Sequence, residues 1–183
     1  ETETVGHVLI FKDVTEDRKL RRKLHFEGLN DPLTGLLNRR SFENRFDAMI
    51  NEAEVTHCQH VMVYINLDQF KLVNDSGGSE AGDELLKQVA KMIQDHVRKS
   101  DALARLGADE FGILFPYART DIAERSAKEI LRLILQQGFS WQERQFQVSA
   151  SAALVEFGDS NDDFAQKYNQ LISAAKQAKE NGG

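Results

Sequence analysis

The chain has 183 residues, of which 41% are hydrophobic and 28% are charged, so it can form one domain with a hydrophobic core and is too short for two domains of ordinary size. Its net charge of −6, with no basic run longer than residues 18–23, argues against a general nucleic-acid-binding protein, and the single cysteine, Cys58, excludes an intramolecular disulfide bond. No apolar run approaches the roughly 20 residues of a membrane span, so we expect a cytoplasmic chain without membrane contact of its own, whether or not a longer parent protein is anchored elsewhere.

The first 29 residues predict one strand and one helix. Residues 5–13 alternate between apolar and polar side chains as a β-strand does, and Thr15 is a suitable cap for a helix that runs to about Leu29. Only two turns of this helix carry an apolar pattern, which fits pairing with its copy in a dimer and packing onto its own domain equally well. Proline disfavours helical geometry in the residue before it, so the helix is expected to end at Asp31-Pro32.

Helices and short apolar strands alternate from residue 39 onward. A helix is predicted over residues 39–53, and its buried stripe, with side chains three and four residues apart, consists of Phe42, Phe46, Met49 and Ile50. The strand at residues 61–67 is almost entirely apolar, so both of its faces are expected to be covered. The later segments are, in order, a helix over 84–97, strands near 103–106 and 111–115, a helix over 120–136, strands near 141–146 and 147–157, and a helix over 162–180.

The segment Gly107-Ala108-Asp109-Glu110 lies between two of these apolar runs, which is the arrangement of a tight hairpin that projects two acids. Gly107 is expected to supply a positive φ for the turn. Two adjacent carboxylates preceded by small residues suit a divalent cation bound to a phosphate. An acidic, solvated turn explains this stretch alone equally well.

Residues 64–83 read Y-I-N-L-D-Q-F-K-L-V-N-D-S-G-G-S-E-A-G-D, an apolar strand followed by polar residues and a glycine-bearing turn. Together with the hairpin, this segment resembles the GGDEF family, the diguanylate cyclase domains of bacterial cyclic-di-GMP signalling. The family patterns D-x-D-x-F-K-x-x-N-D, G-H-x-x-G-D and R-x-G-G-D-E-F are met at most positions, and D-P-L-T-G-L-L-N-R at residues 31–39 matches the opening signature. The resemblance implies an α/β fold with a central mixed, mainly antiparallel sheet flanked by helices, as in nucleotidyl cyclases and polymerase palm domains.

The resemblance also divides the chain. Residues 30–183 correspond to the GGDEF domain. Residues 1–29, through G-H-V-L-I-F-K-D-V-T-E-D-R, resemble the last strand and exit of a PAS sensor domain followed by a linker helix. Possible partners implied by this organisation are a second copy of the chain, an adjoining PAS domain and a downstream phosphodiesterase domain.

The family's catalytic and metal-binding positions fall on four residues of this chain. Asp109 and Glu110 match the catalytic acids, and the positions that hold Mg²⁺ are Asn66, the carbonyl of Leu67, and Asp109. Asn66 replaces an aspartate, and a neutral amide removes a full charge from a site where Mg²⁺ prefers carboxylates. We therefore expect a weakened Mg²⁺ site.

The positions that bind GTP in the family are largely kept. The matching residues are Phe70, Lys71 and Lys179 near the phosphates, Asn74 and Asp83 at the guanine edge, and Gly107 and Ala108 in the hairpin. An amide and a carboxylate can together read the hydrogen-bonding edge of guanine. The ends of the sequence Arg98-Lys99-Ser100-Asp101 match the R-x-x-D inhibitory site, at which Arg98 and Asp101 would bind cyclic-di-GMP.

Other departures affect the same site. Besides Asn66, the replacements are Ser79 for histidine, Ala108 and Ala153 for glycine, and Gly183 for arginine. If Ala108 sits at positive φ or against the ribose, its methyl group would cost on the order of 1 kcal/mol or more.

Three functions follow from this pattern. The leading hypothesis is a catalytically impaired GGDEF domain that binds GTP or cyclic-di-GMP and regulates a partner domain. The second is an active diguanylate cyclase that joins two GTP molecules and releases pyrophosphate. The third is a structural dimerisation or relay module whose nucleotide pocket no longer functions.

Overall fold

The computed structural model describes residues 28–180 of the chain. The strand predicted at residues 5–13, nearly all of the helix predicted from Thr15, and Gly183 lie outside the described residues. None of the helices within the described range is both long and apolar enough to cross a membrane.

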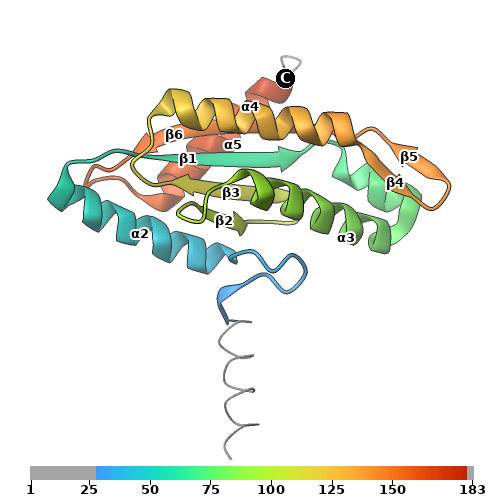
Figure 1. The fold of residues 1–183 in the computed structure, drawn as a ribbon, viewed down its shortest axis with the longest axis horizontal. Helices are drawn as coiled ribbons and strands as arrows, with labels where there is room; N and C mark the ends of the chain where they lie inside the picture. The colour runs from blue at the N-terminus through green and yellow to red at the C-terminus, as the bar shows by residue number, and fades with distance from the viewer. Residues whose placement is uncertain (1–27, 181–183) are drawn as a thin grey trace, which may run out of the picture.

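A four-stranded sheet forms the centre of the molecule, with strands in the order β2-β3-β1-β6 (Figure 1). Its strands are β1 (His60–Leu67), β2 (Ala102–Arg105), β3 (Glu110–Phe115) and β6 (Ala150–Phe157). All of their pairings are antiparallel, and a parallel bridge between Leu37 and Ala104 extends the sheet along β2. The expected mixed, mainly antiparallel sheet is thereby confirmed.

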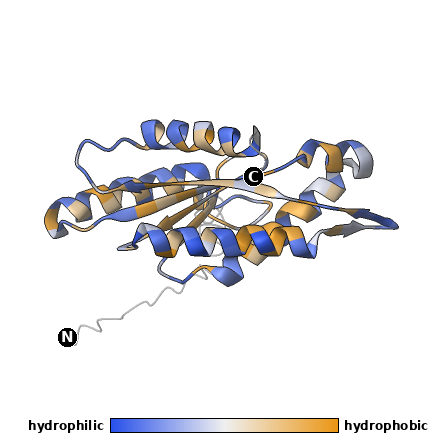
Figure 2. Cartoon of the chain, turned by 90° about the horizontal axis from the view of Figure 1, so that it is seen from above, coloured by the Kyte–Doolittle hydropathy of each residue, from blue (hydrophilic) through white to orange (hydrophobic). Residues whose placement is uncertain are grey.

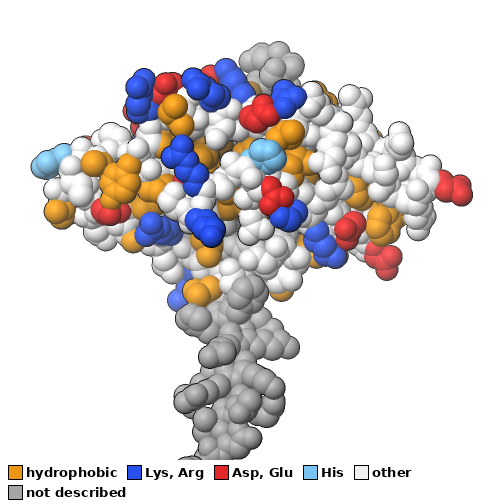
Figure 3. Space-filling view, viewed as in Figure 1, with side chains coloured by type: hydrophobic (Ala, Val, Ile, Leu, Met, Phe, Trp, Pro, Cys, Tyr) orange, Lys and Arg blue, Asp and Glu red, His pale blue; other side chains and the backbone are white. Residues whose placement is uncertain are grey.

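Two helices cover each face of the sheet. They are α2 (Arg39–Thr56) and α5 (Phe164–Glu180) on one face, and α3 (Phe70–His96) and α4 (Thr120–Gln137) on the other. Figure 2 shows hydrophobic strands in the middle of the molecule and helices that carry both hydrophilic and hydrophobic stretches. The described chain is thus a three-layer α/β domain, with basic and acidic side chains interspersed over the face seen in Figure 3.

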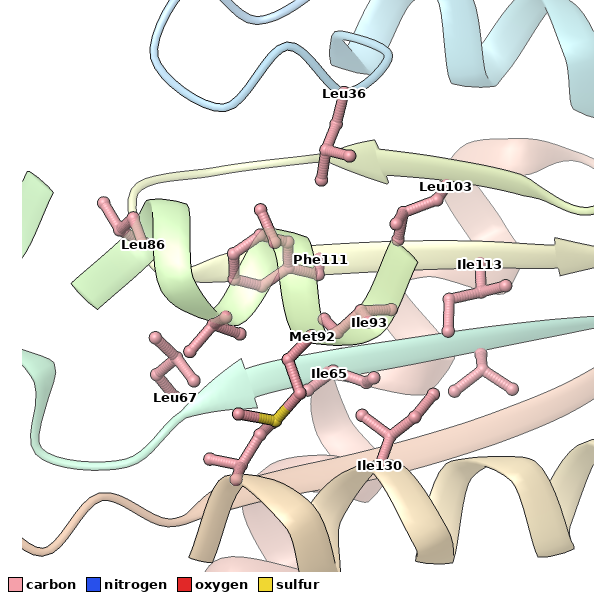
Figure 4. Packing of buried hydrophobic residues seen from close by; sticks show 14 of the residues in the cluster. Leu36, Ile65, Leu67, Leu86, Met92, Ile93, Leu103, Phe111, Ile113 and Ile130 are labelled. Carbon is pink, nitrogen blue, oxygen red and sulfur yellow. The ribbon is translucent and has the colours of Figure 1, made fainter. Parts of the chain in front are cut away.

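Strand β1 supplies buried side chains to both layers, as its apolar sequence predicts. Val61, Val63, Ile65 and Leu67 pack with α3 and α4, whereas Met62 and Tyr64 pack with α2 and α5. This division follows from the alternation of side chains along a strand. Figure 4 shows Ile65 and Leu67 among the buried hydrophobic residues that pack with α3 and α4.

The predicted helix after residue 38 is confirmed. Asn38 caps α2 by accepting a hydrogen bond from the N–H of Ser41 at 2.9 Å, and the stripe that includes Phe42 and Phe46 is buried. The rings of Phe46 and Phe157 stack with centroids 4.3 Å apart, which joins α2 to the end of β6.

Two segments differ from the prediction. α3 begins at Phe70, far ahead of the predicted start at Glu84, and is kinked at Gly78, where φ is 82° and ψ is 171°. The predicted strand at 141–146 is instead a separate hairpin of β4 (Phe139–Trp141) and β5 (Arg144–Phe146). Its aromatic side chains pack against the core, and Arg144 donates a hydrogen bond to the carbonyl of Ser76 near the kink.

Candidate functional site

Backbone hydrogen bonds on both sides hold the hairpin between β2 and β3. The N–H of Leu106 donates to the carbonyl of Glu110 at 2.8 Å, and the N–H of Leu67 donates to the carbonyl of Asp109 at 3.0 Å. The expectation of a positive φ at Gly107 is wrong, because its backbone lies outside that region. A Cβ atom there would lie 2.4 Å from Oε2 of Glu110, so a larger residue would require the Glu110 side chain to shift.

Ala108 also lies outside the positive-φ region, so the backbone strain considered for its methyl group does not arise. Its carbonyl accepts a hydrogen bond from Nη2 of Arg105 at 2.7 Å, and Nη1 of Arg105 lies 3.3 Å from Oδ2 of Asp31. Oδ1 of Asp31 accepts hydrogen bonds from the N–H and hydroxyl of Thr34 at 2.8 and 2.7 Å. The opening signature is therefore tied to the acidic hairpin through Arg105.

Asp109 is half-buried beside β1, and the structure brings it together with Asn66 and Lys179. Burial and the charge of Glu110 raise the pKa of the Asp109 carboxyl, whereas Lys179 and a hydrogen bond from the Asn66 side chain oppose the increase. The net pKa lies above the ordinary value. The Asn66 side chain thus lies close enough to the Asp109 carboxyl to lower its pKa a little.

Glu110 points into the layer that contains α5. Its Oε1 accepts a hydrogen bond from the hydroxyl of Tyr64 at 2.8 Å, and its Oε2 accepts one from the hydroxyl of Tyr168 at 2.5 Å. Burial and these bonds to a carboxylate raise the pKa of both tyrosines, so both phenols stay protonated. The guanidinium of Arg39 lies 4.4 Å from the ring centre of Tyr168 and adds a cation–π contact.

The sequence interpretation missed both tyrosines. Tyr64 is a buried residue of a largely apolar strand. A buried hydroxyl group needs a hydrogen-bond partner, so this tyrosine could have been recognised in the sequence as part of a polar site. Tyr168 carried no comparable signal, because its contact with Glu110 depends on how α5 crosses the sheet.

A cavity of about 530 Å³ lies between α5 and the sheet beside these acids, and we call it the α5 cavity. The sheet lines it with Tyr64, Asn66, Glu110 and Ser151, and the helix lines it with Ile172, Ala175, Lys176 and Lys179. The four helix positions are spaced as i, i+3, i+4 and i+7, which places them on one side of α5. Asn66, Glu110 and Lys179, predicted separately, therefore share one cavity.

Asp68 organises the adjoining edge of the sheet. Its carboxylate accepts hydrogen bonds from the hydroxyls of Ser149 at 2.9 Å and Ser151 at 3.1 Å, and lies 2.9 Å from Nζ of Lys179. A second cavity, of about 610 Å³, is lined by these four residues and by the end of α4. The sequence interpretation gave no role to Asp68, Ser149 or Ser151, whose contacts join segments about 80 residues apart.

The residues predicted to read guanine meet at the kink of α3. A Cβ atom on Gly82 would lie 1.9 Å from Oδ1 of Asn74 and 3.1 Å from the ring of Phe70, so these two side chains lie directly over the glycine. Asp83 follows Gly82 and is exposed. Lys71 is exposed in the first turn of α3, which has no side-chain cap. Asn74 and Phe70 thus lie together beside Gly82, and Asp83 is the next residue along the helix.

Arg98 and Asp101 form the turn between α3 and β2. The N–H of Arg98 donates to Oδ2 of Asp101 at 2.8 Å, and the N–H of Asp101 donates to the carbonyl of Arg98 at 3.0 Å. Both residues line a cavity of about 310 Å³ together with part of the loop at residues 33–38. This pair is separate from the residues that line the α5 cavity.

Three positions of the candidate site correspond to the Mg²⁺ ligands of the family. Asp109 is the only carboxylate among them, Asn66 is a neutral amide close to it, and Leu67 would contribute a carbonyl. Within residues 28–180, no group of three or more histidine, cysteine, aspartate or glutamate side chains is arranged to hold a metal ion. At nucleotide sites Mg²⁺ is usually held by one or two carboxylates together with water and the phosphates of the substrate, and Asp109 and the carbonyl of Leu67 would be this chain's contribution to such a set.

A model of the family described as "Diguanylate cyclase, GGDEF domain" matches residues 29–183. The chain therefore belongs to the GGDEF family of cyclic-di-GMP signalling domains. It is 41% identical over 179 residues to the probable diguanylate cyclase DgcE of Escherichia coli K12, which covers 98% of this chain and 16% of that protein. It is 29% identical over 180 residues to a diguanylate cyclase of Vibrio cholerae, which covers 98% of this chain and 56% of that protein.

Solved structures agree with the fold. Diguanylate cyclase SiaD of Pseudomonas aeruginosa, solved with its activator SiaC, has a TM-score of 0.81 at 27% identity, over 91% of this chain and 64% of that one. The coiled coil and GGDEF domain of DgcB from Caulobacter crescentus has a TM-score of 0.84 at 21% identity, over 93% and 90%. The chain thus corresponds to the GGDEF part of proteins that are in several cases much longer.

Proposed function

We propose that this chain is a guanine-nucleotide-binding regulatory GGDEF domain with little or no cyclase activity. The observation that carries the proposal is that a neutral amide, Asn66, lies beside Asp109 at the metal position of the family. A carboxylate pair there would attract a divalent cation, whereas one carboxylate beside an amide supplies one negative charge fewer. Cyclisation needs metal ions to neutralise the triphosphate and to activate the attacking hydroxyl.

Nucleotide binding is supported by residues other than Asn66 and Asp109. Asn74 lies over Gly82, and the exposed Asp83 is the next residue along the helix, so an amide and a carboxylate are available to a guanine edge. The first turn of α3 presents backbone N–H groups without a side-chain cap, and Lys71 lies in that turn. GTP would therefore keep the contacts to its guanine base in a chain that does not convert it to cyclic-di-GMP.

The R-x-x-D turn supports cyclic-di-GMP as a second ligand. Arg98 and Asp101 both line the 310 Å³ cavity, and the Asp101 carboxylate accepts a hydrogen bond from the backbone N–H of Arg98. A guanidinium can form paired hydrogen bonds with a guanine or a phosphate. Bound nucleotide would act on adjoining parts of the parent protein, for which we propose a preceding PAS domain, a second copy of the chain and, in some arrangements, a phosphodiesterase domain.

Calorimetric titration of the whole chain with GTP and Mg²⁺, followed by analysis of the products, tests the proposal. We expect saturable binding that is lost in Asp83→Ala and no cyclic-di-GMP in the mixture. The Arg98→Ala variant should retain GTP binding and lose cyclic-di-GMP binding. Retention of cyclic-di-GMP binding by this variant would remove the inhibitory site from the proposal.

An active diguanylate cyclase is the second candidate, favoured by the presence of Asp109, Glu110 and Lys71 at their family positions. In that case Asn66→Asp should change the rate of product formation only slightly. Activity that appears only in the Asn66→Asp variant would support the impaired domain and exclude this candidate.

A further inference from the structure

We propose that the β4–β5 hairpin positions the guanine-binding residues of α3, and that Arg144 is the side chain through which it does so. This inference rests on the proposed function, because it takes Asn74 and Asp83 to contact a guanine base. It gives Arg144 a positioning role in nucleotide binding, whereas the sequence interpretation gave this residue no role.

The contact between Asn74 and Gly82 depends on the kink in α3. The two residues are eight positions apart, which in a straight helix would separate them by about 12 Å along the axis. The kink at Gly78, where φ is 82° and ψ is 171°, instead brings the Asn74 side chain over Gly82, where a Cβ atom would lie 1.9 Å from its Oδ1. The angle at the kink therefore determines how Asn74 lies relative to Asp83, the next residue along the helix.

The hairpin contacts α3 immediately before the kink. Arg144 donates a hydrogen bond to the carbonyl of Ser76. Gly77 allows the indole ring of Trp141 to approach the helix, because a Cβ atom on this glycine would lie 3.3 Å from Cδ1 of the ring. The helical backbone is interrupted at the next residue, so the guanidinium donates to a carbonyl in the turn where regular helical hydrogen bonding ends.

The hairpin is also joined to α3 after the kink and to the core. Nε2 of Gln88 donates to the carbonyl of Gly138, the residue before β4, at 3.2 Å. Phe139 is buried, and its ring centre lies 6.3 Å from that of Trp141 and 6.0 Å from that of Phe146. Figure 1 shows the hairpin at the end of the molecule where α3 begins. A hairpin held in this way links the two halves of α3 and limits changes in their angle.

Arg144 can be replaced without disturbing the core. Its side chain is exposed, so a substitution there is expected to change overall stability little. The aromatic side chains of the hairpin, by contrast, pack against the core. A substitution of Arg144 therefore separates an effect on the position of Asn74 from an effect on folding.

Calorimetric titration of the whole chain with GTP and Mg²⁺, well below the unfolding temperature, tests the inference. We expect the dissociation constant to rise about tenfold in Arg144→Met, because the turn before the kink loses a charged hydrogen bond. Arg144→Lys should stay within about threefold of the unmodified chain, since a lysine keeps a cationic donor for a single carbonyl. Arg119→Met is the matched control, because Arg119 is an exposed arginine that pairs with Asp121 at the start of α4. This control should bind GTP as the unmodified chain does.

Hydrogen exchange of the unmodified chain gives a second measurement that does not depend on how a variant folds. Coupling between two parts of a protein is reciprocal. If the hairpin holds the guanine-binding conformation of α3, bound GTP should slow amide exchange in β4 and β5. Inorganic tripolyphosphate, which carries no base, should leave exchange in these strands unchanged.

Unchanged GTP affinity in Arg144→Met, a loss that Arg144→Lys fails to restore, or hairpin amides that GTP does not protect would overturn this inference and leave the proposed function intact. Equal protection by tripolyphosphate would also overturn it, because the effect would then come from the phosphates. Failure of the unmodified chain to bind GTP would overturn the inference together with the GTP-binding part of the proposed function.

Discussion

At the scale of single residues, the site places ionisable groups where folding alone would not favour them. Asp109 is half-buried next to a second carboxylate, and the pKa of its carboxyl is raised for that reason. Glu110 is held in place by tyrosine hydroxyls on both of its oxygens. Functional sites commonly carry such unfavourable arrangements at the expense of stability.

We expect Asp109→Asn to raise the melting temperature at pH 7 in EDTA. A carboxyl whose pKa is raised by folding destabilises the folded chain when it is ionised, so the unmodified chain bears this cost above the raised pKa. The cost disappears below the unfolded value of 3.8, where the carboxyl is protonated in both states. Thermal unfolding measured from pH 7 to pH 3 should therefore show the two proteins converging in acid, and a constant difference would contradict this explanation.

We expect Tyr168→Phe to lower the free energy of unfolding by about 1–3 kcal/mol, because a buried oxygen of Glu110 would lose its donor. Urea unfolding measures the loss, and the exposed Tyr117→Phe is the control, with little expected change. In Glu110→Gln the same tyrosine substitution should cost less, because the charged acceptor is gone. Equal costs in the two backgrounds would show that the hydrogen bond contributes little.

At the scale of elements, short connections hold the site together. The loop that follows Asp31 is joined to β2 through Arg105, which also binds the hairpin carbonyl of Ala108. At the other end of the sheet, the kink at Gly78 allows Asn74 to lie over Gly82.

We expect Asp31→Asn to destabilise the chain by at least about 1 kcal/mol at pH 7, because it weakens charged hydrogen bonds to Thr34 and Arg105. Burial alone would raise the pKa of Asp31, but the Thr34 hydrogen bonds and the charge of Arg105 bring it below 3.8. The stabilisation is therefore present above pH 3.8 and is lost as the pH falls through the lowered pKa. Urea unfolding at pH 7 and at about pH 3 should show a smaller difference at the lower pH.

We expect Gly78→Ala to cost about 1–3 kcal/mol of stability and to weaken GTP binding. The backbone conformation at Gly78, with φ of 82° and ψ of 171°, is almost restricted to glycine, although a Cβ atom there would meet no neighbour within 4 Å. The neighbouring Ser79→Ala should change both quantities little, since Ser79 is exposed. Unfolding and GTP titration of the two variants, carried out side by side, would separate the effect of the kink from that of the loop surface.

For the molecule as a whole, the periodicity of apolar residues predicts the layers, and the resemblance to the GGDEF family predicts the fold. The stripe that begins at Phe42 and the apolar strand at 61–67 are confirmed, because burial of apolar side chains imposes a repeat that depends only on local sequence. The early start of α3 could not be read from its glycine- and polar-rich sequence, which is also typical of turns. The β4–β5 hairpin packs beside this part of α3, and Arg144 donates a hydrogen bond to the carbonyl of Ser76 there.

Part of the candidate site could likewise be predicted from the sequence, and part of it could not. The resemblance to the GGDEF motifs predicted Asn66, Asp109 and Lys179 as site residues, and the structure brings them together. The partners of Glu110 and Asp68 could not be predicted, because a tyrosine or serine becomes a partner only through register and helix placement that local sequence does not encode. The prediction of a positive φ at Gly107 failed for the same reason. The glycine there leaves space for the Glu110 side chain, whose position the local sequence does not encode.

We propose that the chain binds GTP and fails to cyclise it because of Asn66. The most direct test is to incubate the unmodified chain and Asn66→Asp with GTP and Mg²⁺, measuring bound GTP and cyclic-di-GMP in the same samples. We predict that the unmodified chain binds GTP without forming product, and that Asn66→Asp forms more product than the unmodified chain does. Sustained synthesis of cyclic-di-GMP by the unmodified chain would contradict the claim.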